Sequence, residues 1–251
     1  MAKLVWDKEE ERTFETGVDR GVLYVKGKAD AADDKYEIAG VSLGDTTIKS
    51  HYKEGVVWNG LTSVTENPSG AEANDIYADN IKYASIRSAE TFGGTIEAYM
   101  YPDAFKVCDG SEEVATGVYV GQQKRTPFGF AFRTDKGDAS ENSIDVNANY
   151  KLHLVYGATA SPSQSQYSTI NESPEAITFS WEFSTIPTSA GAAYKPTSLL
   201  TIDSSKLDVA GKTKLTALEE VLYGTDGKNE QTGHAGFLPD PDQIVSFFKK
   251  S

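Results

Sequence analysis

The fold class is decided by the stretch Ile76-Tyr-Ala-Asp-Asn-Ile-Lys-Tyr-Ala-Ser-Ile-Arg-Ser-Ala-Glu-Thr-Phe-Gly-Gly-Thr-Ile-Glu-Ala-Tyr-Met-Tyr-Pro-Asp-Ala-Phe-Lys-Val-Cys-Asp-Gly110. From Thr91 to Tyr101 an apolar set of residues alternates with a mainly polar set, a period of two that is typical of a half-buried β-strand. Pro102 then ends the strand, because proline has no N–H to donate to a neighbouring strand. Pro102 also favours a short helix that finishes before Gly110.

The first part of this stretch, Ile76 to Arg87, allows two interpretations. As a helix, it would begin near Asp79, whose side chain can cap free backbone N–H groups. As a strand, it places alternating residues on one face, namely Ile76, Ala78, Asn80, Lys82, Ala84 and Ile86. We favour the strand, which has Tyr77, Tyr83 and Arg87 on its other face.

Short strands joined by turns account for most of the remaining chain. The cleanest alternation lies between Ile177 and Ser184, which predicts a central core strand. Further strands are expected at 18–26, 36–43, within 48–65, and at 117–120, 128–133, 151–156 and 199–203. The sequence therefore predicts a mainly β fold, a two-sheet β-sandwich or barrel.

One helix is expected on a flank of the sheets, because apolar residues recur at intervals of three and four from Lys212 to Tyr223. Thr216 and Glu219 have the spacing of a capping box, and Gly224 would end the helix. Together with the short helix after Pro102, this is the expected helical content.

Polar segments between the strands are expected to be loops. Asn67-Pro-Ser-Gly70 is a strong turn signal, and the small polar residues up to Asp75 extend it. The acidic segment 134–149 is a second predicted loop. We expect a single domain over 1–251, with an N-terminal arm at 1–17 and a C-terminal tail at 225–251.

The segment from Phe128 to Phe132 carries large rings on one face and only Gly129 and Ala131 on the other. A face without side chains lets another backbone approach closely. We therefore expect a neighbouring segment to pack on Gly129.

Composition excludes several functional classes. The chain has 251 residues, a formal net charge of −13 and a mean hydropathy of −0.43. An acidic surface does not grip nucleic acid, which requires basic patches. A single cysteine, Cys108, permits no internal disulfide. We expect neither a secretion signal nor a membrane span, because no apolar run is long enough.

Catalytic and metal-binding patterns are absent from the sequence. His51, His153 and His234 lie far apart in unlike contexts, which favours a structural role for each. Cys108 is expected to be a small buried residue. Asp145, Asn147 and Asn149 have the spacing that begins a calcium loop, but Tyr150 occupies the position that requires glycine. We therefore expect no catalytic residues, no metal and no cofactor.

The opening stretch and the segment before it, Trp58 to Glu72, resemble the major tail proteins of long-tailed, non-contractile phages of Gram-positive bacteria. Segments 122–132, 150–160, 171–183 and 194–203 are similar to the same family, in the same order. The resemblance covers most of residues 21–224. One departure lies near the C-terminus, where Asp240 occupies a position expected to be apolar, which puts the docking of the tail in doubt.

The resemblance implies a virion structural protein rather than an enzyme. Members of the family form hexameric rings that stack into a tail tube, which is assembled in the host cytoplasm and conducts DNA during ejection. The implied partners are further copies of the chain and the tail terminator, distal tail and tape-measure proteins. DNA is expected to pass through the lumen without specific binding, and no membrane is involved.

Six residues are candidates for contacts between subunits or rings. The loops at 67–75 and 29–36 are expected to join rings, and large aromatics are expected at subunit boundaries. The candidates are Trp58, Asn67, Asp75, Tyr77, Ala29 and Tyr36. For each aromatic, a place in the core is the alternative.

Two other functions fit the sequence. The first is the tube of a contractile injection device or tail-like bacteriocin, which shares the architecture. The second is a carbohydrate-binding β-sandwich, in which exposed aromatic side chains would stack on sugars.

Overall fold

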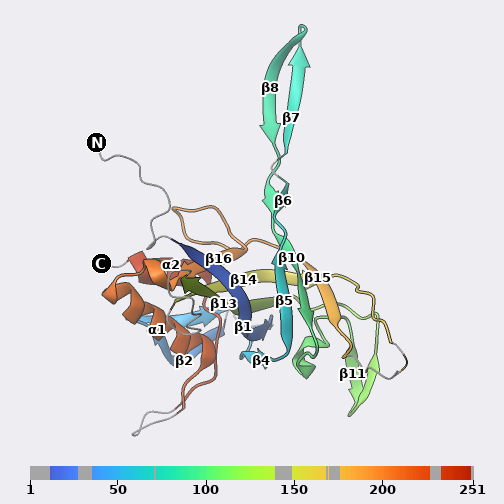
Figure 1. Cartoon of the computed structure of the whole chain (residues 1–251), viewed down its shortest axis with the longest axis vertical. Coiled ribbons are helices and arrows are strands. Elements are labelled where there is room, and N and C mark those ends of the chain that lie inside the picture. The colour runs from blue at the N-terminus through green and yellow to red at the C-terminus, as the bar shows by residue number, and fades with distance from the viewer. Residues whose placement is uncertain are drawn as a thin grey trace.

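A computed structural model describes residues 12–27, 36–70, 72–138, 149–167, 169, 176–226 and 233–249 (Figure 1). The predicted mainly β fold is confirmed. The strands are β1 (Thr13–Val25), β2 (Tyr36–Leu43), β3 (Thr46–Ser50), β4 (Val56–Trp58), β5 (Leu61–Glu66), β6 (Ser69–Gly70), β7 (Ala73–Ala78), β8 (Ile81–Arg87), β9 (Glu90–Thr91), β10 (Gly93–Ala98), β11 (Glu112–Ala115), β12 (Val118–Val120), β13 (Phe128–Asp138), β14 (Tyr150–Ala160), β15 (Phe179–Thr185) and β16 (Leu199–Asp203). The helices are α1 (Val209–Tyr223) and α2 (Pro241–Lys249), with 3₁₀ turns η2 (Asp103–Phe105) and η3 (Ser204–Lys206).

The main sheet is antiparallel, with the strand order β4-β1-β13-β14-β15-β10-β5, and β16 pairs with β14 beside this path. The first and last strands, β4 and β5, are joined by only two residues, Asn59 and Gly60. β1 also lies against β5, and a side chain at Gly21 would overlap Leu61. The sheet therefore curls until its two ends meet, as in a small barrel.

The inner face of this curled sheet holds a core rich in aromatic rings. The alternation of β13 and β15 places Phe128, Phe130, Phe132, Trp181 and Phe183 inside. Rings from outside these two strands complete the core, since the centroid of Trp58 lies 4.6 Å from that of Phe105. Burying each such side chain stabilises the fold by about 1.5–3 kcal/mol. The strand predicted around Trp181 is therefore central, although it begins at Phe179.

A second core lies on the outer face of the sheet, under α1, α2 and the β2–β3 hairpin. Leu152, Leu154 and Tyr156 of β14 point into it, while Val155 points into the inner core, as their alternation predicts. A side chain at Gly129 would overlap Leu238. The close approach expected at this bare face is thus made by the segment before α2.

Both C-terminal helices correct the sequence prediction. The N-terminus of α1 is capped by Asp208, whose side chain accepts a hydrogen bond from the backbone N–H of Gly211. Thr216 lies inside the helix and donates to the carbonyl of Lys212, so the capping-box assignment was wrong. The tail contains a second helix, α2, in which Ile244 is buried. The prediction of a single flanking helix missed it because the segment spans only nine residues.

Two predicted irregular segments belong to one strand pair. Residues 13–17 begin β1, although an arm was expected there, and residues 134–138 end β13, although a loop was expected. They pair with each other, with Thr13 opposite Asp138 and Thr16 opposite Asp135. Both segments are polar and therefore lack the apolar alternation that marks a strand. Charged side chains support this polar pair, as in the ion pair that Glu15 of β1 makes with Lys151 of β14, across β13.

Candidate assembly surfaces

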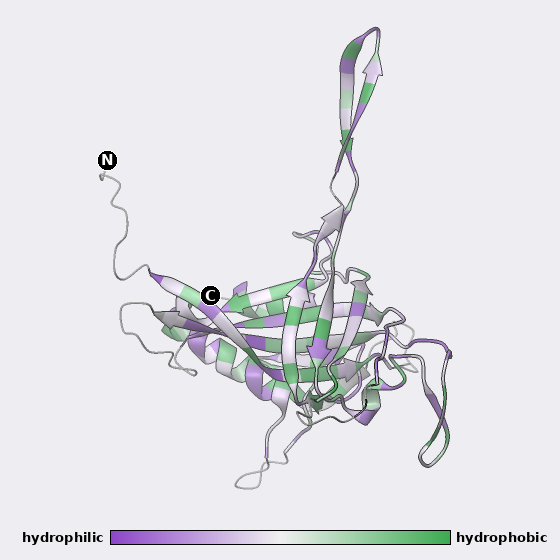
Figure 2. Ribbon diagram, turned by 45° about the vertical axis from the view of Figure 1, so that its right-hand side comes forward, coloured by the Kyte–Doolittle hydropathy of each residue, from purple (hydrophilic) through white to green (hydrophobic). Residues whose placement is uncertain are grey.

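The most prominent feature of the molecule is a long β-ribbon that leaves the barrel and projects far beyond it (Figures 1 and 2). Its root is formed by β5 and β10, its neck by β6 and β9, and its outer part by β7 and β8. We call the outer part, residues 72–88, the arm. The segment 67–75, predicted as a loop, is therefore largely strand, because its small polar residues pair with 85–91.

The tip of the arm is a tight two-residue turn at Asp79 and Asn80. Their φ angles are 51° and 61°, both in the left-handed region that Asp and Asn tolerate better than other side chains. Positive φ at both central residues is the mark of a type I′ hairpin turn. The single strand predicted from Ile76 to Arg87 is therefore wrong, as is the alternative helix, and the two strands fold back on each other.

The two faces of the arm differ in character. Opposed residues of a hairpin share a face, and on one face Ile76 lies opposite Ala84 and Ala78 opposite Ile81. Tyr83, at a bulge in β8, is 75% exposed. We call the set Ile76, Ala78, Ile81, Ala84 and Ile86 the apolar face of the arm.

The opposite face of the arm is mainly polar. A carboxylate oxygen of Asp75 accepts a hydrogen bond of 2.7 Å from Ser85, and the other oxygen lies 2.8 Å from Nζ of Lys82. The hydrogen bond from Lys82, followed by that from Ser85, lowers the pKa of the Asp75 carboxyl. Tyr77 lies opposite Lys82 on this face. The arm is thus an amphipathic ribbon.

An amphipathic ribbon of two strands cannot bury its own apolar face. An isolated two-stranded hairpin is marginally stable in water, because it has no second layer to cover it. Among the described residues, no element packs over the apolar face, and Ile81 is 63% exposed. The arm therefore presents an apolar surface of the kind found at protein interfaces, and no described element of the same chain covers it.

The six candidate contact residues lie in different surroundings. Asp75 and Tyr77 are on the polar face of the arm. Asn67 lies near its root and donates its N–H to the carbonyl of Gly93. Trp58 is 2% exposed, so it is a core residue and not a surface anchor. The remaining candidates are elsewhere in the chain: the backbone of Tyr36 begins β2, opposite Ser50, and Ala29 lies outside the described residues.

A second apolar surface lies at the opposite end of the ribbon from the arm. β4 exposes Val56 and Val57, and the two residues that follow β10, Tyr99 and Met100, are more than half exposed. The N–H of Tyr99 donates to the carbonyl of Gly60, and the indole of Trp58 donates to the carbonyl of Met100. We call the two residues after β10, Tyr99 and Met100, the far-end patch; Val56 and Val57 point to opposite faces of β4, since their partners Leu23 and Val22 belong to different cores.

A third apolar surface is the small hairpin of β11 and β12, which also stands away from the barrel (Figure 1). Val114, Val118 and Val120 are exposed on it. Nζ of Lys106 lies 3.9 Å from the centre of its Tyr119 ring, and the N–H of Gln123 donates to the carbonyl of Gly110 at its base. Sequence reasoning identified neither this hairpin nor the far-end patch as a contact surface, because exposure cannot be read from alternation alone.

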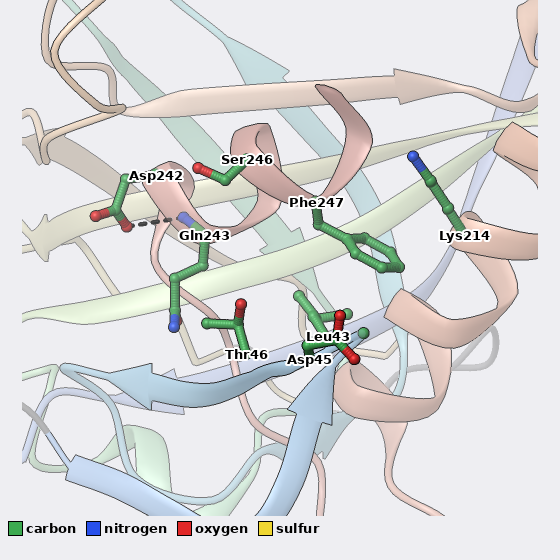
Figure 3. A pocket seen from close by; sticks show the side chains of 9 residues that line it. Leu43, Asp45, Thr46, Lys214, Asp242, Gln243, Ser246 and Phe247 are labelled. Atoms are coloured by element: carbon green, nitrogen blue, oxygen red, sulfur yellow. Dashed lines mark hydrogen bonds between the residues drawn. The ribbon is translucent and has the colours of Figure 1, made fainter. Parts of the chain in front are cut away.

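The hollow beside α2 shows how the C-terminal tail is fixed (Figure 3). The side-chain amide of Gln243 accepts from the N–H of Lys49 and donates to the carbonyl of Thr47. It thereby covers the outer edge of β3, as a strand residue would. Phe247, Leu43 and Lys214 line the same hollow. These contacts are structural, and they show that the tail is docked on the body.

The histidines and the cysteine considered in the sequence have defined surroundings in the described part of the chain. No three metal-binding side chains gather there. His51 pairs with Asp240, and His153 bonds to Glu66 and Thr134 and stacks on Phe132. Cys108 is fully buried, as predicted. No described helix is long and apolar enough to cross a bilayer.

No protein-family model matches the chain, and no curated protein matches it. The features that indicate a function are the three exposed apolar surfaces and the resemblance carried by the sequence.

Proposed function

We propose that the chain is a structural subunit that polymerises with further copies of itself, as the tube of a phage tail does. The apolar face of the arm carries this proposal. An exposed ribbon with Ile76, Ile81, Tyr83 and Ile86 on its surface gains stability only when another surface covers it. The sequence resemblance to major tail proteins points to hexameric rings stacked into a tube.

The strands supply a second way to associate. β16 pairs on one side only, with β14, and β4 at the end of the sheet is only three residues long. Exposed edge strands pair readily with other strands and so promote aggregation, and assembly into a closed ring leaves fewer of them exposed. Lateral contacts of this kind would form the ring, and the arm would join one ring to the next.

The net charge suits a conduit for DNA. Copies with a formal charge of −13 present a negative surface, which phosphate groups do not adhere to. We propose that acidic residues line the lumen. The proposed function is then mechanical, because DNA passes through the lumen and no covalent bond is made or broken.

The proposal is tested by sedimentation velocity of the full chain over a range of concentrations, beside an arm-deleted variant. In that variant, residues 71–89 are replaced by Asn-Gly, which closes a two-residue turn between the paired residues Gly70 and Glu90. The full chain should form rings and longer polymers. The variant should keep the melting temperature of the parent and form no long polymers.

Two results would count against the proposal. If the arm-deleted variant polymerises as well as the parent, the arm does not join copies. If the parent stays monomeric at every concentration and is retained on a polysaccharide column, a carbohydrate-binding module is the better interpretation.

A further inference from the structure

We infer that the link between β4 and β5 is a site of spontaneous covalent modification, where Asn59 loses ammonia after attack by the backbone nitrogen of Gly60. The inference does not rest on the proposed function. Asn59 and Gly60 form the single Asn-Gly pair among the 251 residues. They lie at the end of the barrel opposite the arm, where the first and last strands of the curled sheet are joined (Figure 1).

The fold requires glycine at position 60. The φ angle of Gly60 is 76°, in the left-handed region that favours glycine. A Cβ there would lie 2.8 Å from Cγ of Met100 and 3.4 Å from the backbone nitrogen of the same residue. The carbonyl of Gly60 also accepts a hydrogen bond of 2.8 Å from the N–H of Tyr99, which ties the link to the segment after β10. Any other residue at this position would therefore strain the link.

The missing side chain also leaves the backbone nitrogen of Gly60 open to reaction. A peptide nitrogen is a weak nucleophile, because its lone pair is delocalised into the adjoining carbonyl. It attacks a neighbouring side-chain amide most readily where no Cβ hinders its approach, which is the case at glycine. Gly60 is exposed, and no described residue accepts a hydrogen bond from its N–H. Hydroxide from the solvent can therefore remove the proton of this nitrogen.

Asn59 supplies the carbon atom that is attacked. The residue is exposed, and its side-chain amide makes no hydrogen bond with any described residue. Asparagine side chains in turns often bond to backbone groups nearby, which holds the amide in a fixed position. No such bond fixes Asn59 within the described part of the chain. Its side chain can therefore rotate until Cγ meets the nitrogen of Gly60.

The reaction needs water and no other co-reactant. The nitrogen of Gly60 gives up its proton and forms a bond to Cγ of Asn59, and the side-chain nitrogen takes up a proton and leaves as ammonia. The product is a five-membered cyclic imide. Water then cleaves one of the two bonds that the ring nitrogen makes to a carbonyl carbon. Cleavage at Cγ gives aspartate, and cleavage at the main-chain carbonyl carbon gives isoaspartate.

The two products differ in their effect on the fold. Aspartate adds a negative charge to an exposed residue and leaves the backbone unchanged. Isoaspartate carries the main chain through Cβ, which inserts one carbon atom into a link of only two residues. The buried Trp58 precedes this link, and its indole N–H donates to the carbonyl of Met100 at 3.0 Å. The insertion therefore displaces Trp58 or Gly60 from its hydrogen bond and loosens the junction of the two sheet ends.

The test is peptide mapping by mass spectrometry after incubation of the folded full chain at neutral and mildly alkaline pH. The chain contains two internal controls. Asn80 is exposed in a tight turn, but the branched Ile81 follows it and hinders attack, so Asn59 should react at least about tenfold faster than Asn80. Asn67 precedes Pro68, whose nitrogen has no proton to lose, and should stay intact. The rate at Asn59 should rise with pH.

Two variants complete the test. Asn59→Gln keeps an amide but would have to close a larger ring, so it should melt with the parent and lose ammonia far more slowly. Asn59→Asp carries the added charge without the added backbone atom, and it should melt at a higher temperature than the isoaspartate form separated from the aged parent. Retention of the Asn59 amide in the folded chain, or a rate no faster than that of Asn80, would overturn the inference. Equal melting of the isoaspartate form and Asn59→Asp would overturn the effect assigned to the inserted atom.

Discussion

Nδ1 of His51 lies 2.8 Å from a carboxylate oxygen of Asp240, which joins the segment before β4 to the segment that leads into α2. Asp240 is 1% exposed, at a position where the resemblance leads one to expect an apolar residue. The acid does not prevent the tail from docking, because the pair with His51 compensates for its burial. The first prediction follows from this pair.

Replacing Asp240 by alanine should destabilise the fold by about 1–3 kcal/mol, because Nδ1 of His51 would lose its hydrogen-bond acceptor. Chemical denaturation of Asp240→Ala measures the loss. The exposed Asp103, which pairs with Lys106, is the control, and Asp103→Ala should change the free energy of unfolding by less than about 1 kcal/mol. Equal effects of the two substitutions would show that the buried pair stabilises the fold no more than the exposed pair does.

Gly129 should tolerate no side chain. A Cβ there overlaps the buried Leu238 and lies only 3.2 Å from the Tyr52 ring, so Gly129→Ala should cost about 1–3 kcal/mol. Gly121 has no atom within 4 Å of a built Cβ, and Gly121→Ala should be neutral. Thermal melting compares the two. A melting temperature for Gly129→Ala equal to that of the parent would contradict the close packing of the tail on β13.

Alkaline pH should destabilise the folded chain. Burial, with the charge of Asp109 adding to it, raises the pKa of the Cys108 thiol to about 12. Burial is also the main cause that raises the pKa of Tyr52 to about 12 and those of Tyr24 and Tyr156 well above 10.

Each of these groups has a higher pKa in the folded chain than in the unfolded chain. Its contribution to stability is therefore fully present at any pH below the pKa of the unfolded chain. This contribution is lost as pH rises from about 9 through 12, by up to about 1.4 kcal/mol per pH unit for each group. Denaturation midpoints between pH 7 and 11 measure the slope. A flat profile over that range would be inconsistent with the burial of these groups.

Added salt should promote polymerisation. The proposed contact made by the arm is apolar, whereas the chain as a whole repels other copies at a charge of −13. Raising the ionic strength from 0.1 to 1 M shortens the Debye length from about 10 Å to about 3 Å and so weakens the repulsion. Light scattering should show a lower critical concentration at high salt. Dissolution of polymers by salt would mean that ion pairs, and not apolar side chains, hold them together.

The sequence predicts well the elements in which burial imposes a strict pattern. The strand around Trp181, the alternation of Leu152 with Val155 and the approach of another segment to Gly129 all follow from one face being buried. Each of these features involves one of the two cores, where a polar side chain that pointed inward without a partner would destabilise the fold.

The sequence does not predict two kinds of element. One kind is held by pairing between polar strands, and the other is an exposed apolar surface that no described part of the chain covers. Thr13 to Gly17 pair with a charged strand and show no apolar alternation. The arm does alternate, but its tip at Asp79 and Asn80 interrupts the pattern, and two short strands therefore read as one longer strand. The far-end patch depends on how β4 and β10 end together in space, which no local pattern encodes.

The central claim is that copies of this chain join through the arm, and a cryo-EM map of the polymers formed by the full chain tests it most directly. The expected map shows stacked rings in which the apolar face of each arm is buried against a copy in the next ring. A map in which the arms extend into solvent, or particles that remain single copies while the arm is ordered and uncovered, would contradict it.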